Sequence, residues 1–185
     1  MIIFAHLVPK RQWTQSDWCR FVASEESRVP AHQHMSFRLR KRRRCAPDHR
    51  LTVAFAHNAR AFHAMAWTDD DRVGIRSAYH SAIAIELGLK AYLLHRGLSD
   101  DWNRAYLRHD LTKALRCVRM LGFQDIPDGI AELADVLGPL YASGALRSGM
   151  SNPELPLSPD AIDQAICDLL SAVEAAIGVE CEANP

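Results

Sequence analysis

Four polar side chains in one predicted helix have the types and spacing of a polar cluster. They are Arg76, His80, Glu86 and Lys90. Positions 76, 80 and 83–87 fall on one helical face, and Glu86 precedes Lys90 by four residues, the order that favours an ion pair. The sequence leaves two interpretations open. The favoured one is an ion-pair network that holds helices in register, and the other is a binding site formed by these four residues.

A dense cationic run near the N-terminus could bind a polyanion. The run is RLRKRRR, and its basic residues are Arg38, Arg40, Lys41, Arg42, Arg43 and Arg44. Residues 1–50 hold eleven Lys or Arg against four Asp or Glu, a net charge of +7, so the rest of this neutral chain carries −7. This asymmetry predicts a basic arm attached to an acidic domain. A merely flexible arm is the favoured interpretation, and contact with nucleic acid is the alternative.

Neither a metal site nor a cofactor is expected. His32, His34, Cys45 and His49 could ligate zinc, but their spacing is loose and the cationic run between them would repel a cation. The acids at 69–71 are adjacent on a turn and do not converge on one ion. The sequence also lacks a Gly-rich phosphate loop, a nucleophile elbow and a metalloprotease motif.

The five cysteines are odd in number and widely spaced, without a CxxC pair. This usage is typical of reduced thiols, so a cytoplasmic protein is expected. The first eight residues are too short for a signal sequence, and no run approaches the length of a membrane span. We therefore expect a soluble protein that does not associate with membranes.

From residue 51 onward, apolar residues recur every three or four positions, which predicts an all-α fold. The expected helices span 51–67, 71–96, 111–121, 128–147 and 160–177, the fourth with a kink at Gly138-Pro139. Three parts are expected: a poorly ordered or partly helical arm at 1–50, a helical domain at 51–178 and a frayed acidic tail at 179–185. An antiparallel bundle of four to five helices is the natural architecture.

The second of these helices is apolar around most of its circumference, which places it at the centre of the bundle. Gly88 costs about 1 kcal/mol relative to alanine inside a helix, so a close packing contact is expected there. Gly97 is the expected left-handed residue that ends the helix.

The stretch YHSAIAIELGLKAYLLHRG, followed by RHDLTKAL, resembles the HEPN superfamily (higher eukaryotes and prokaryotes nucleotide-binding domain). Members often show A-x-E-x-x-L-K-A-x-L on one helix and H-D-L at the start of the next. The matching residues here are Ala84, Glu86, Leu89, Lys90, Ala91 and Leu93, then His109, Asp110 and Leu111. The resemblance covers residues 51–177 and leaves residues 1–50 out.

The resemblance implies a helical bundle that is often a homodimer. Many members are metal-independent ribonucleases of toxin–antitoxin and other defence systems, where an Arg-x4–6-His motif near a late helix does the chemistry. A nucleotidyltransferase-like antitoxin is the implied protein partner. A histidine can move protons at the 2′-hydroxyl or the leaving 5′-oxygen, and an arginine can hold the phosphate.

This chain departs from the family at that motif. The equivalent arginine is Arg147, but no histidine follows it or occurs anywhere after His109. Arg104 and His109 have the motif's spacing on a different loop. The candidate catalytic residues are therefore His109, Arg104 and Arg147. Arg108 and Asp110, which flank His109, join the four residues of the predicted cluster as binding candidates.

Three functions remain open. The first is a catalytically degenerate HEPN-like module that acts by binding RNA or protein. The second is an active metal-independent ribonuclease with an irregular Arg/His site. The third is a structural helical bundle whose basic arm docks on nucleic acid.

Overall fold

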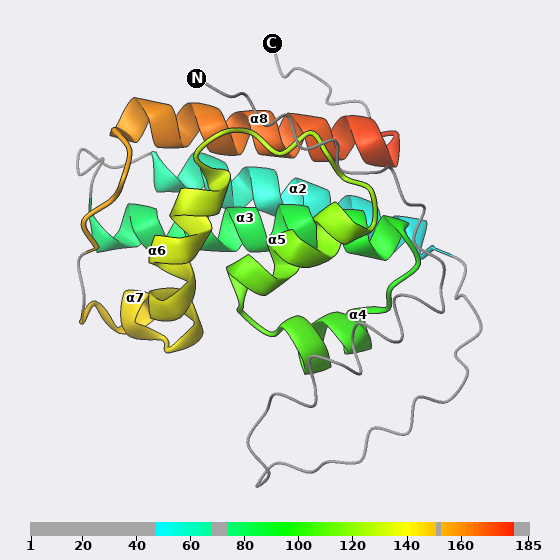
Figure 1. Ribbon diagram of the computed structural model, residues 1–185, viewed down its shortest axis with the longest axis horizontal. Helices are drawn as coiled ribbons and strands as arrows, with labels where there is room; N and C mark the ends of the chain where they lie inside the picture. The colour runs from blue at the N-terminus through cyan, green and yellow to red at the C-terminus, as the bar shows by residue number, and fades with distance from the viewer. Residues whose placement is uncertain (1–46, 68–73, 151–152, 180–185) are drawn as a thin grey trace, which may run out of the picture. The chain divides into compact units, whose positions relative to one another are not determined.

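The computed structural model describes residues 47–67, 74–150 and 153–179. They all belong to one compact unit, Arg42–Pro185. Every regular element among them is helical, which confirms the all-α prediction (Figure 1). The arm's cationic run, the acids at 69–71 and most of the acidic tail lie outside the described residues.

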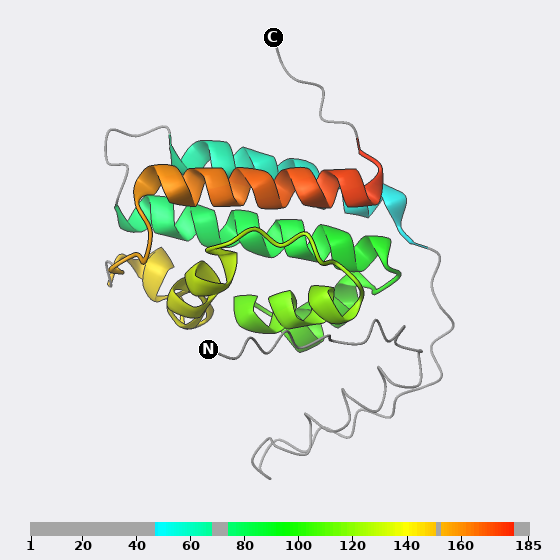
Figure 2. The same ribbon diagram turned by 45° about the horizontal axis from the view of Figure 1, so that its top comes forward.

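Seven α-helices and one π-helix form this part of the chain. They are α2 (His49–Ala66), α3 (Ile75–His95), α4 (Asp100–Trp102), the π-helix η1 (Asn103–Leu107), α5 (Leu111–Met120), α6 (Ile130–Ala142), α7 (Ala145–Ser148) and α8 (Pro159–Ile177). The long helices α2, α3 and α8 lie side by side in both ribbon views (Figures 1 and 2). Helix α3 lies between the α2–α8 pair and the group formed by α5, α6 and α7.

Helix α3 is buried on almost every side, as its sequence predicted. Fourteen of its 21 residues are buried, and Ile85, Leu89 and Leu93 are fully enclosed. A Cβ on Gly88 would lie 2.6 Å from Cδ2 of Leu170 on α8, so this glycine permits the close approach of the two helices. The expected left-handed conformation of Gly97 is also confirmed, with φ 86°.

Local capping signals set several helix ends. The Ser158 hydroxyl accepts a hydrogen bond from the Ala161 N–H, Pro159 occupies the first turn, and α8 ends at Gly178 with φ 72°. Helix α2 begins at His49, two residues earlier than expected, because the Asp48 carboxylate accepts a hydrogen bond from the Leu51 N–H.

Two of the predicted segments were assigned wrongly. The expected helix over 128–147 is divided into α6 and α7 by Gly144, whose φ of 78° interrupts the helical geometry. The helix continues past Pro139, where the kink was expected, and ends at Ala142. Residues 99–108, expected to be a polar connection, instead form α4 and η1.

Candidate functional site

A buried ion pair lies in the second half of α3. The Nζ atom of Lys90 is 2.5 Å from Oε1 of Glu86, one helical turn earlier, and the two residues are only 8% and 4% exposed. Removing two charges from water is costly, so such a pair persists only where further hydrogen bonds satisfy both groups. The ammonium of Lys90 donates a second hydrogen bond, of 2.8 Å, to the backbone carbonyl of Arg108.

The other oxygen of the Glu86 carboxylate is held by a tyrosine from α6. The Tyr141 hydroxyl donates to Oε2 of Glu86 at 2.5 Å. Burial, and then the negative charge of Glu86, raise the pKa of Tyr141. The phenol therefore remains protonated and acts as a hydrogen-bond donor over the whole physiological pH range.

His109 forms the solvent-facing side of the same cluster. Its Nδ1 atom lies 3.3 Å from each oxygen of Glu86, and its ring meets the Tyr141 ring edge-on at 5.0 Å between centroids. The side chain is 59% exposed, and Nε2 has no hydrogen-bond partner among the described residues. We call Glu86, Lys90, His109 and Tyr141 the Glu86 cluster.

This arrangement resembles the carboxylate–imidazole pairs that enzymes use for proton transfer. A carboxylate on one ring nitrogen orients the imidazole and favours the tautomer in which that nitrogen carries the hydrogen. The opposite nitrogen is then an acceptor that faces solvent. The Glu86 cluster can therefore present His109 as a hydrogen-bonding group or as a general base.

A strained turn carries His109. Arg108 has φ 53° and ψ −116°, values of the first central residue of a type II′ turn, where glycine is preferred. The Asp110 N–H donates to the Leu107 carbonyl at 3.0 Å and closes the turn. The Asp110 carboxylate then accepts from the Lys113 N–H at 2.8 Å, which caps α5 immediately after the turn.

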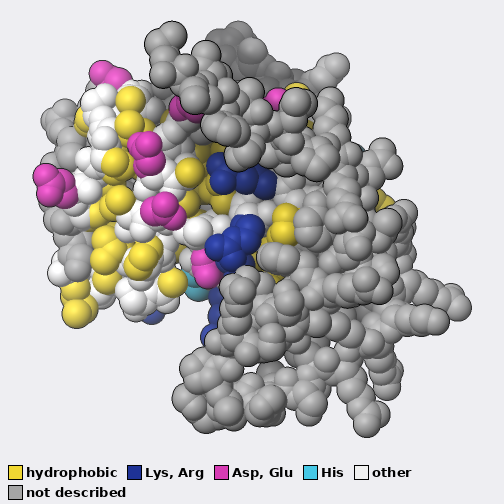
Figure 3. Space-filling view, in the orientation of Figure 1, with side chains coloured by type: hydrophobic (Ala, Val, Ile, Leu, Met, Phe, Trp, Pro, Cys, Tyr) yellow, Lys and Arg dark blue, Asp and Glu magenta, His cyan; other side chains and the backbone are white. Residues whose placement is uncertain are grey.

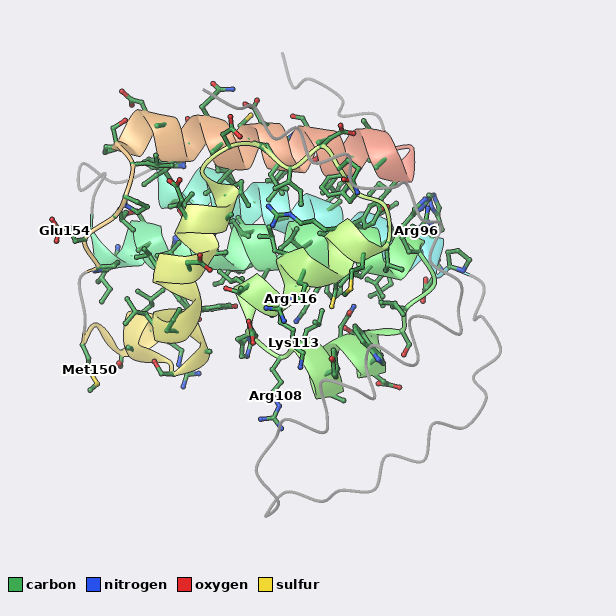
Figure 4. All side chains as sticks on the ribbon, in the orientation of Figure 1. Arg96, Arg108, Lys113, Arg116, Met150 and Glu154 are labelled. Atoms are coloured by element: carbon green, nitrogen blue, oxygen red, sulfur yellow. The ribbon has the colours of Figure 1, made fainter. Side chains whose placement is uncertain are left out.

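Basic residues are concentrated in the segment 104–119, which contains His109, and we call their side chains the basic surface around His109. Between residues 104 and 119 there are five Lys or Arg and one acid, whereas α6 and α8 contain only acids among their charged side chains. The five are Arg104, Arg108, Lys113, Arg116 and Arg119. All except the half-buried Lys113 are exposed. Figure 4 shows Arg108, Lys113 and Arg116 near one another, and Figure 3 shows Lys and Arg side chains gathered in the middle of the same face.

The structure separates the residues that the sequence grouped on α3. Glu86 and Lys90 are in contact, but Arg76 is exposed at the start of the helix. His80 instead packs against the rings of Phe62 and Tyr79, at centroid distances of 5.9 and 6.0 Å. Of the predicted cluster, only the ion pair between Glu86 and Lys90 is formed. The further partners of Glu86, His109 and Tyr141, come from outside α3.

The candidate catalytic residues also lie on separate elements. Arg104 belongs to η1, where its Nε atom is 2.9 Å from Oδ2 of Asp100 and its side chain is 77% exposed. Arg147 is exposed near the end of α7. Only His109 is in contact with a buried charged group. The six arm residues, Arg38, Arg40, Lys41, Arg42, Arg43 and Arg44, lie outside the described residues.

Sequence reasoning missed two members of the site. Tyr141 was not among the candidate site residues, although a buried tyrosine requires a partner for its hydroxyl. That requirement was the available signal. The sequence carried no signal for the second member, the Arg108 carbonyl, because the orientation of a carbonyl depends on backbone geometry and not on residue type.

A second polar contact, between α2 and α8, was also missed. The guanidinium of Arg60 holds the buried Glu174 with two hydrogen bonds of 2.8 and 2.7 Å, and a third of 2.8 Å reaches the Ser171 hydroxyl. The hydrogen bond to Glu174 is the main cause that raises the pKa of Arg60. A fully engaged pair of this kind holds two helices together and leaves no group open for chemistry.

The described residues contain neither a metal-ligand group nor a membrane-spanning helix. No group of three or more His, Cys, Asp or Glu side chains in this part of the chain could hold a metal ion. Among the same residues, no helix has both the length and the apolar character needed to cross a membrane.

Comparisons with family models, curated proteins and solved structures gave no match. The HEPN resemblance therefore stays a prediction that rests on the residues at 84–93 and 109–111.

Proposed function

We propose that this protein is an HEPN-like helical bundle of a toxin–antitoxin or other defence system that binds RNA through the basic surface around His109. The observation that carries the proposal is the local charge of that surface. Five cationic side chains between residues 104 and 119 face two acids, Asp110 and the Asp100 that pairs with Arg104, on a domain that is otherwise acidic. Phosphates supply most of the electrostatic affinity for nucleic acid, and clustered Lys and Arg are its usual footprint.

The test is the salt dependence of RNA binding. A labelled single-stranded oligoribonucleotide is titrated with the full chain at several KCl concentrations, and binding is followed by fluorescence anisotropy. Each lost phosphate contact should make the negative slope of log K against log salt shallower by about 0.7. We expect that change for Arg108→Gln and for Arg116→Gln.

Two further variants separate this surface from the rest of the chain. Arg50→Gln removes an equal charge from the exposed first turn of α2 and should leave the slope unchanged. Replacing the six basic residues of the arm by glutamine tests the alternative in which the arm alone docks. Equal slopes for wild type, Arg108→Gln and Arg116→Gln, with a collapse only in the arm variant, would refute the proposed surface.

A second candidate function is an active metal-independent endoribonuclease, favoured by the contact between Glu86 and His109. In that reaction the Nε2 atom of His109 accepts the 2′-hydroxyl proton while the 2′-oxygen attacks phosphorus. The 5′-oxygen leaves and takes up a proton from a solvent water, giving a 2′,3′-cyclic phosphate and a 5′-hydroxyl end. Arg108 lies next in sequence and could stabilise the charge that develops on the phosphoryl oxygens.

This candidate is tested by incubating RNA with the purified chain in EDTA and analysing the product ends. Cyclic-phosphate products that disappear in His109→Ala would support it. Intact RNA under all conditions would leave the binding function, and the same anisotropy titration would still measure it.

Partners follow from the resemblance and belong to the proposal. A homodimer would bring two basic surfaces into one particle, and light scattering would give its mass. A nucleotidyltransferase-like antitoxin should co-purify with the chain at fixed stoichiometry if the two are co-expressed. If the chain binds that protein but no RNA, the module acts by protein binding.

A further inference from the structure

Unfavourable features are concentrated in the segment 103–110, which carries His109. It begins with the π-helix η1, a geometry that is rare and often marks functional sites. The side-chain amide of Asn103 is fully buried, and neither its oxygen nor its nitrogen has a partner among the described residues. The segment then passes through Arg108 with its positive φ. Such features persist only where the surroundings impose them.

The surroundings fix both ends of Arg108. Its N–H donates to the Asn103 carbonyl at 3.0 Å, which closes the π-helix. Its carbonyl accepts from the Lys90 ammonium at 2.8 Å. An L-residue at this turn position prefers a negative φ, as in the commonest turn type, and reaching that geometry would change the φ of Arg108 by about 110° and its ψ by about 90°. A rotation of that size would disturb the bond between the Arg108 carbonyl and the buried ammonium of Lys90, so this bond favours the observed backbone conformation.

Contacts other than the bond from Lys90 also hold η1 in place. The Tyr106 ring is stacked on Trp102 at 4.7 Å, and the ammonium of Lys113 lies 3.5 Å from its centroid, which fastens η1 to α5. The bond from Lys90 therefore acts locally, on the orientation of a single peptide. That peptide determines where the His109 side chain begins.

We infer that Lys90 is the positioning residue for His109. It holds the strained Arg108 peptide in the orientation that directs Nδ1 of His109 to Glu86 and leaves Nε2 facing solvent. Lys90 does not touch RNA, and its charge is neutralised by Glu86. The inference rests on the proposed function in one respect only, since it takes His109 as the group presented to RNA.

The test is the tautomer of His109 in the RNA-free full chain, read from its ring ¹⁵N shifts at about pH 8.5, where free histidines are neutral. Wild type should show the tautomer with hydrogen on Nδ1. Lys90→Met should lose it. Lys90→Met/Arg108→Gly should regain it, because glycine adopts positive φ without help. An unchanged tautomer in Lys90→Met, or no recovery in the double variant, would overturn the inference.

Thermal unfolding gives an independent test if Lys90→Met does not fold. Arg108→Gly relieves the strained φ and should raise the unfolding midpoint by about 1–4 °C. The matched control, Arg119→Gly, places glycine in the last turn of α5 and should lower it. A lower midpoint for Arg108→Gly would show that the turn is unstrained and would overturn the inference.

The two proposals fail separately. A wild-type protein with the expected tautomer but no RNA affinity removes the proposed function and leaves Lys90 as a positioning residue. RNA affinity that falls in Arg116→Gln, together with an unchanged tautomer in Lys90→Met, keeps RNA binding and removes the role of Lys90.

Discussion

Two ion pairs with the same i,i+4 spacing make the energetics of the Glu86 cluster measurable. Glu86 and Lys90 are buried, whereas Asp100 and Arg104 form their pair with the arginine side chain 77% exposed. We predict that Lys90→Met lowers the free energy of unfolding by about 3–5 kcal/mol, because it leaves a buried carboxylate without its counter-charge. Arg104→Met should cost about 0–1 kcal/mol, since water replaces the lost partner.

The same reasoning predicts recovery when the whole polar core of the cluster is removed. Glu86→Leu/Lys90→Met/Tyr141→Phe leaves no buried charge and no buried hydroxyl. The Arg108 carbonyl and the His109 ring lose their partners, but both residues are exposed and water can bond to them. The free energy of unfolding of the triple variant should therefore lie within about 2 kcal/mol of the wild-type value, closer to it than that of Lys90→Met.

Urea titrations followed by circular dichroism at the helical band would measure these differences, with the m-values compared to verify that the native states remain compact. A loss below about 1 kcal/mol in Lys90→Met would refute the buried pair. A triple variant less stable than Lys90→Met would show that the polar cluster is needed for folding. Near-wild-type stability, combined with loss of RNA affinity, would show instead that the cluster serves the site.

Two further predictions concern packing and reactivity. Gly88→Ala should destabilise the protein by about 0–2 kcal/mol, because a gain of about 1 kcal/mol in helix propensity is outweighed by the clash with the buried Leu170. Gly138→Ala, whose new Cβ would have no neighbour closer than 3.8 Å, should be neutral or stabilising, so a higher urea midpoint for Gly88→Ala than for Gly138→Ala would contradict this assignment. Burial raises the pKa of Cys117 to about 12, so at pH 8 only about one molecule in 10⁴ carries the reactive thiolate. In the native protein iodoacetamide should therefore label the half-buried Cys167 long before Cys117, as peptide mass mapping would show, and equal rates would contradict the burial.

The helices themselves were largely predictable because their signals are local. The cap, first-turn proline and final glycine of α8 lie within the helix and its flanking residues, and the apolar period of α3 is visible without any neighbour. The predictions failed where local signals compete. Gly144 interrupts a favourable apolar pattern, and η1 forms in a polar stretch because Tyr106 and Leu107 pack against the rest of the fold.

The sequence by itself determined that the chain is helical, that α3 is central, and that Glu86 and Lys90 are one turn apart. The tertiary structure decided what these charges do. Tyr141 is 55 positions from Glu86 and His109 is 23, and neither distance follows from any periodic pattern. A buried carboxylate must be satisfied by whatever donors the packing brings to it, and only the crossing of α3, α6 and the turn at Arg108 places those donors together. Whether the His109 ring lies against Glu86 and faces solvent is therefore a property of the assembled helices and not of the H-D-L motif alone.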